Sequence, residues 1–176
     1  MIGLFARLRR DHRGVSAVEF ALIAPALIAF YFGLAEFTQA MMAERRASHV
    51  AASMGDLVAQ STQISDSTLT DIFTIGTTIM SPFPTSTLKM RLTSVTANSS
   101  GTPKVDWSKG SGLTALTNGA TVTLPTGLVT AGQSVIMSEV TYVYDSPVDQ
   151  FIPGSITFTK KFYLRPRKSD QVTKSS

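Results

Sequence analysis

Glu19 is the residue whose chemistry most needs an explanation. It lies near the start of an otherwise apolar run, VSAVEFALIAPALIAFYFGLAEF at residues 15–37, and sixteen uncharged residues separate it from Glu36. A carboxylate at the centre of a membrane-spanning helix costs about 2.5–3.5 kcal/mol, and less near an interface. An acidic side chain kept in this position therefore indicates a function, and the chemistry it offers there is ion pairing.

Few other residues in the sequence suggest a catalytic or metal-binding site. The chain has no cysteine, which excludes disulfides, thiolate nucleophiles and thiolate metal sites. After the first fourteen residues the only histidine is His49, and no nucleophile motif or second histidine accompanies it. We expect His49 to be a solvated helix residue, and we expect no enzyme activity, no cofactor and no metal site. Trp107, the sole tryptophan, is expected in the core, and the alternative is an exposed aromatic that contacts a pilus or envelope partner.

The residues just before Glu19 suggest a processing site. The string GVSAVEF, from Gly14 to Phe20, resembles the prepilin peptidase site of type IV pilins, where the cut follows a glycine. In that pattern the fifth mature residue is Glu and an aromatic comes next. The resemblance implies cleavage between Gly14 and Val15. The new α-amino group would be largely cationic, with a pKa of about 7.7–8.0, and could pair with Glu19 of a neighbouring subunit and set the helix register, with Phe20 beside it.

The resemblance extends to a particular family. GVSAVEFALIAPALIAFYFGLAEF looks like the N-terminus of the TadE-like proteins of tight-adherence (Flp-type) pilus systems, including the proline inside the apolar run. QSVIMSEVTYVYDSP and ITFTKKFYLRPR look like the last two strands of that family. The resemblance implies a minor pilin or pseudopilin, TadE or TadF, whose partners are the prepilin peptidase, other pilins and the pilus assembly machinery.

The elements that position these residues begin with a long helix. Residues 15–37 are long enough to span a bilayer, and the basic leader at residues 1–14 predicts a cytoplasmic N-terminus. The rest of the chain would then be periplasmic, anchored in a bacterial inner membrane, or carried out into a pilus. Pro25 should kink the helix. Residues 38–60 continue it with an apolar stripe, because Ala40, Ala47, Ala51, Met54 and Val58 recur at helical spacing.

An α+β domain is expected at residues 61–165. The pattern predicts a short helix at 67–80 and then changes to the two-residue period of strands. The expected strands are 87–96, 104–108, 121–124, 134–144 and 155–164. Antiparallel strands packed on the stripe of the long helix make a pilin-like architecture. Residues 166–176 contain little apolar surface and are expected to be a flexible tail.

Charge distribution narrows the functions further. The formal net charge is +4, but residues 1–14 alone supply +3, so the remaining domain lacks a basic face for nucleic acid. No motif indicates a small-molecule substrate. The alternative to a processed pilin is an uncleaved membrane anchor that holds an extracytoplasmic binding or scaffold domain. A soluble enzyme released by ordinary signal cleavage after Ala40 is a third possibility, which the missing catalytic residues disfavour.

Overall fold

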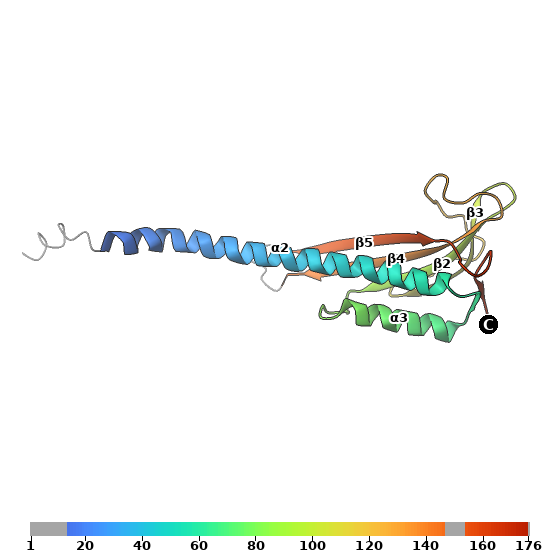
Figure 1. The fold of residues 1–176 in the computed structure, drawn as a ribbon, viewed down its shortest axis with the longest axis horizontal. Helices are drawn as coiled ribbons and strands as arrows, with labels where there is room; N and C mark the ends of the chain where they lie inside the picture. Colours follow the sequence, from blue (N-terminus) through green and yellow to red (C-terminus); the bar gives the residue numbers. More distant parts are fainter. Residues whose placement is uncertain (1–13, 147–153, 176) are drawn as a thin grey trace, which may run out of the picture. The chain divides into compact units, whose positions relative to one another are not determined.

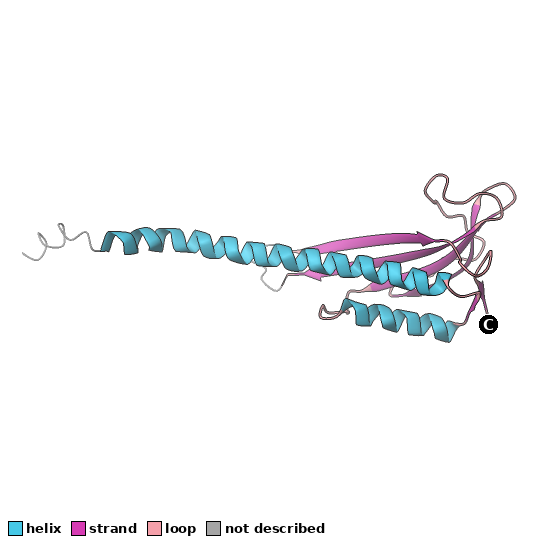
Figure 2. Ribbon diagram, in the orientation of Figure 1, coloured by secondary structure: helices cyan, strands magenta, loops and turns pink. Residues whose placement is uncertain are grey.

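A computed structural model of the chain describes residues 14–146 and 154–175 (Figure 1). Two α-helices and four main strands account for most of these residues, with two very short strands in addition (Figure 2). The helices are α2, Val15–Ala59, and α3, Asp66–Met80. The strands are β1 Gln63–Ile64, β2 Lys89–Ala97, β3 Pro103–Ser111, β4 Ser134–Asp145, β5 Ser155–Leu164 and β6 Thr173–Lys174.

The chain divides into two compact units. The first contains the N-terminal residues up to Gln39 together with the connection between β4 and β5, Ser146–Gly154. The second contains Ala40–Asp145 and Ser155–Ser176. Helix α2 contributes residues to both units.

Helix α2 confirms the prediction of one helix over residues 15–60. It runs without interruption through Pro25, and alanine and leucine, both good helix formers, are frequent along it. Because proline lacks a backbone N–H, one intrahelical hydrogen bond is missing at this point. The expected kink at Pro25 stays a prediction.

The second unit is built on a four-stranded antiparallel sheet with the strand order β3-β2-β4-β5. Strand β4 is central and long, and its register pairs Glu139 with Arg91 of β2 on one side and Lys161 of β5 on the other. A register shift between Ser94 and Val95 of β2 skips Asp106, the extra residue of a bulge in β3. The α+β class predicted from the sequence is confirmed.

One face of this sheet packs against α3 and the second half of α2. The helix stripe predicted from the spacing is buried, as are the inward side chains of the strands, and together they form one core. Its main members are Ala40, Ala47, Val50, Ala51, Met54, Val58, Leu69, Ile72, Phe73, Met90, Leu92, Trp107, Ile136, Val140 and Tyr142.

Two glycines allow the helices to approach closely. A Cβ atom on Gly55 of α2 would lie 2.5 Å from Cδ1 of Leu164 and 3.2 Å from Cβ of Ser138. A Cβ atom on Gly76 of α3 would lie 2.9 Å from Sδ of Met54 and 2.8 Å from Sδ of Met90. Gly55 therefore allows α2 to pack closely on β4 and β5, and Gly76 allows α3 to pack closely on α2 and β2.

The C-terminal residues contradict the prediction of a flexible tail. Strand β6 pairs in parallel with β1, and Val172 is fully buried. The indole Nε1–H of Trp107 donates a hydrogen bond to the carbonyl oxygen of Val172 at 2.7 Å. The prediction failed because a short polar segment can be held by backbone pairing and one apolar side chain.

Two strand predictions were also inaccurate. Residues 121–124 do not form a strand, since only Thr121 makes an isolated bridge, to Lys104. Strand β3 is longer than the predicted 104–108 because its pairing with β2 extends from Pro103 to Gly110. The other three strand predictions agree with β2, β4 and β5 to within about two residues.

Candidate assembly site

The predicted processing bond lies at the start of α2. Gly14 is an exposed residue in a single helical turn directly before the helix, and Val15 is the first α-helical residue, 44% exposed. Open space surrounds Gly14, because an added Cβ atom would meet nothing within 4 Å. The rest of the basic leader, residues 1–13, lies outside the described residues. The predicted cleavage between Gly14 and Val15 stays a prediction.

Glu19 lies one helical turn after Val15. Residues four apart share one face of a helix, with their Cβ atoms about 5–6 Å apart, so the carboxylate of Glu19 follows the N-terminal end of the helix closely. A negative charge is favourable there because the helix dipole presents positive charge at that end. Among the described residues Glu19 is exposed and has no hydrogen-bond or ion-pair partner. The carboxylate is thus available for a cation from outside this part of the chain.

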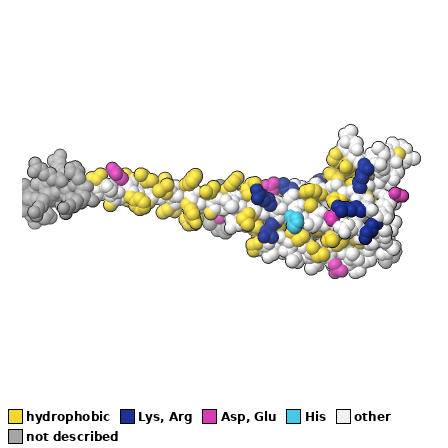
Figure 3. Space-filling view, in the orientation of Figure 1, with side chains coloured by type: hydrophobic (Ala, Val, Ile, Leu, Met, Phe, Trp, Pro, Cys, Tyr) yellow, Lys and Arg dark blue, Asp and Glu magenta, His cyan; other side chains and the backbone are white. Residues whose placement is uncertain are grey.

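The helix around Glu19 exposes large apolar side chains on all sides. Figure 3 shows one face of this apolar surface along the N-terminal half of α2. The most exposed members are Phe20, Leu22, Phe30 and Tyr31, at 66–76%. This is one helix long and apolar enough to cross a membrane, and none of its apolar window is buried within the chain. An all-round apolar helix is stable only in lipid or among other helices, which indicates that it anchors the chain in a membrane.

Glu36 ends this apolar stretch in a different environment from Glu19. Glu36 follows Glu19 by seventeen positions of helix, about 25 Å at 1.5 Å per residue. Glu36 is only 5% exposed, and Oγ of Ser146 donates a hydrogen bond to its Oε2 at 2.5 Å. The contact ties the β4–β5 connection to the helix within the first unit. This role of Glu36 was not predictable from the sequence, because Ser146 lies 110 positions away in the chain.

Charged side chains link several elements of the second unit. Lys160 of β5 forms an ion pair with Glu44 of α2 at 2.5 Å, and Nη1 of Arg46 donates to the carbonyl oxygen of Ile79 at 2.9 Å. Arg167 pairs with Asp56 at 2.5 Å. These contacts fix α2 to the sheet, to α3 and to the C-terminal segment.

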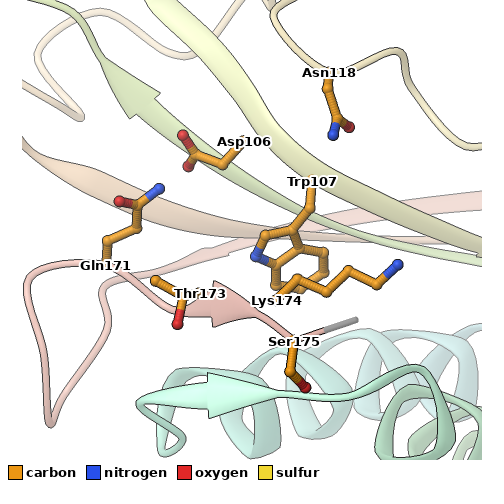
Figure 4. A pocket seen from close by; sticks show the side chains of 7 residues that line it. All are labelled: Asp106, Trp107, Asn118, Gln171, Thr173, Lys174 and Ser175. Carbon is orange, nitrogen blue, oxygen red and sulfur yellow. The ribbon is translucent and has the colours of Figure 1, made fainter.

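A polar pocket of about 320 Å³ lies beside Trp107 (Figure 4). Asp106, Asn118, Gln171, Thr173, Lys174 and Ser175 line it with Trp107. Several of these groups already have structural partners. Asp106 accepts hydrogen bonds from Ser94 and Thr96, and Lys174 pairs with Asp66 at 2.9 Å. The pocket therefore lies where the C-terminal strand closes onto the sheet.

The histidine and acidic side chains of the described residues do not gather into a metal-binding group. His49 is exposed on α2, as expected. No group of three or more histidine, aspartate or glutamate side chains in this part of the chain could hold a metal ion. The features that suggest a function are therefore concentrated in the exposed N-terminal helix.

Comparison with known proteins gives one match. Residues 14–55 match the model of the TadE-like protein family. The matched segment begins at Gly14 and includes Glu19, Pro25 and most of α2. The match confirms the resemblance of the N-terminal segment that was inferred from the sequence. No curated protein and no solved structure is significantly similar to the chain.

Proposed function

Starting from its TadE-like N-terminal segment, which associates the chain with tight-adherence pili, we propose that this protein is a minor pilin or pseudopilin. In this proposal it initiates or caps the pilus, or is incorporated into it. The observation that carries it is the exposed carboxylate of Glu19, five residues after Gly14, on a helix whose surface is otherwise uncharged from Val15 to Ala35.

Processing at Gly14 would complete the chemistry of this site. A prepilin peptidase in the inner membrane cuts between Gly14 and Val15 and leaves a cationic amine at the end of α2. In a bundle of such helices the amine of one subunit pairs with Glu19 of its neighbour. The pairing offsets the burial of both charges and selects the register in which they meet. The domain that follows the helix lies in the periplasm, because the basic leader stays cytoplasmic.

The first experiment is to determine the intact mass and N-terminal sequence of the protein from native membranes, with and without the prepilin peptidase. A chain that starts at Val15 only when the peptidase is present supports the proposal. A chain that keeps Met1 in both cases favours the alternative, an uncleaved anchor with a binding or scaffold domain. A chain that starts near Met41 would eliminate both and favour a secreted protein.

Substitution of Glu19 tests the ion pair separately from processing. We expect Glu19→Gln to be cut normally but to reduce pilus assembly about tenfold or more, because the buried amine of the neighbour loses its counterion. Glu19→Asp keeps the charge and serves as the matched control, with assembly closer to the parent. Normal pilus numbers for Glu19→Gln would refute the electrostatic role and leave the processing claim intact.

A further inference from the structure

Strand β5 lies at an open edge of the sheet (Figure 1). The opposite edge, β3, is partly covered by the segment around residues 119–120. The N–H of Val105 donates to the carbonyl oxygen of Ala120 at 3.0 Å, and the N–H of Gly119 donates to the carbonyl oxygen of Val105 at 2.7 Å. In residues 14–146 and 154–175 no segment pairs with the outer side of β5. A free edge exposes backbone donors and acceptors to any extended chain.

The side chains of β5 define two different faces for a strand added at this edge. Ile156, Phe158 and Phe162 point toward the helices and are only partly buried. Thr157 and Thr159 point to the opposite face and are exposed. An added strand would continue this alternation, so it would be apolar on the helix side and polar on the other.

The charges around β5 determine which polar residue an added strand should carry. On the helix side Lys160 is neutralised by Glu44. On the other side Lys161 and Arg91 share one carboxylate, Glu139, at 2.7 Å and 2.5 Å. Glu139 is buried, whereas the side chain of Lys161 is 50% exposed on the face of the sheet away from the helices. Two cations with one anion leave a net positive charge beside the open edge.

We propose that β5 is a docking edge for an extended segment of another protein, apolar on the side that faces the helices and carrying a carboxylate opposite Lys161. The added strand extends the sheet by backbone hydrogen bonds, and the carboxylate completes the charge balance of the Arg91–Glu139–Lys161 row. A second copy of β5 is a poor occupant, because SITFTKKFYL contains two lysines and no acidic residue. The proposal does not depend on whether Gly14 is a cleavage site.

The test uses the full chain in detergent micelles and a capped peptide that alternates valine and threonine around one central glutamate. We expect the peptide to bind and to slow hydrogen exchange of the β5 amides. A peptide with a central lysine in place of glutamate should bind about tenfold more weakly. The Lys161→Glu variant should instead bind the lysine peptide more tightly than the glutamate peptide. Lys89→Glu is the matched control, since Lys89 is an exposed lysine at the start of β2, and it should leave the preference unchanged.

Three results would overturn the proposal. The first is that the glutamate peptide does not bind, or that it binds without slowing hydrogen exchange of the β5 amides. The second is that a peptide N-methylated at alternate amides binds as tightly as the unmethylated peptide. Methylation removes the N–H donors that a β-ladder needs. The third is self-pairing: the chain has no natural cysteine, so disulfide-linked dimers of Thr159→Cys formed under mild oxidation in competition with the peptide would identify a second copy as the occupant.

Discussion

Gly110 is the residue at which a single methyl group should do most harm. A Cβ atom there would lie 1.9 Å from the carbonyl oxygen of Leu113, a backbone atom that no rotamer change can move away. We expect Gly110→Ala to destabilise the second unit by about 1–3 kcal/mol. Urea unfolding followed by the emission of Trp107, the sole tryptophan, measures the loss.

The neighbouring Ser111→Ala provides the control for this measurement. Ser111 is half-buried at the end of β3, and its substitution should change the free energy of unfolding by less than about 0.5 kcal/mol. Equal effects of the two substitutions would show that the chain relaxes around Gly110 without cost.

Single residues were predictable from sequence only where their immediate neighbours explained them. Glu19 was identified because a carboxylate in an apolar run is costly whatever surrounds it. Glu36 has the same chemistry, but its partner Ser146 comes from a distant part of the chain. The roles of Glu139 and its two cations were invisible for the same reason, since they depend on the register of three strands.

At the scale of elements, periodicity predicted those that bury a continuous face. Helices α2 and α3 and strands β2, β4 and β5 each present a repeating apolar pattern, and each was found. Strand β6 has no such pattern, because two residues and a parallel partner in β1 give no local signal. At residues 121–124 a strand was predicted but is not formed. These residues include β-branched side chains, yet only Thr121 makes a bridge to the sheet.

The docking of the C-terminal strand should depend on pH through Asp66. The side chains of Lys174 and Lys109 hold the pKa of this carboxyl below its usual value of 3.8. A carboxyl whose pKa is lowered by folding stabilises the folded state at pH values above its unfolded pKa. This contribution disappears as the pH falls through the lower pKa of the folded state. Asp66→Asn should therefore destabilise the protein at neutral pH and converge with the parent in strong acid.

Thermal unfolding across this pH range measures the effect of Asp66→Asn. Asp71→Asn, on the exposed surface of the same helix and without an ion pair among the described residues, is the control. A difference between Asp66→Asn and the parent that persisted unchanged in strong acid would contradict an electrostatic origin.

At the scale of the whole molecule, the apolar N-terminal helix and the folded core are separate in sequence. Every member of the core described above lies between Ala40 and Val172, so the core needs no side chain from the exposed apolar segment. The first unit adds the Glu36–Ser146 contact, which belongs to its own residues. We infer that the second unit contains the determinants of its own folding, whereas the first depends on lipid or on other helices.

Two fragments test this division. Residues 40–176 should be soluble without detergent, unfold cooperatively and keep the blue-shifted emission of a buried Trp107, which is only 4% exposed. Residues 40–171 lack Val172 and strand β6, so the indole N–H loses its buried acceptor and β1 loses its partner. This loss should lower stability by about 1–3 kcal/mol or more and move the emission toward red. Aggregation of the longer fragment, or an emission typical of exposed indole, would show that the core requires the apolar helix after all.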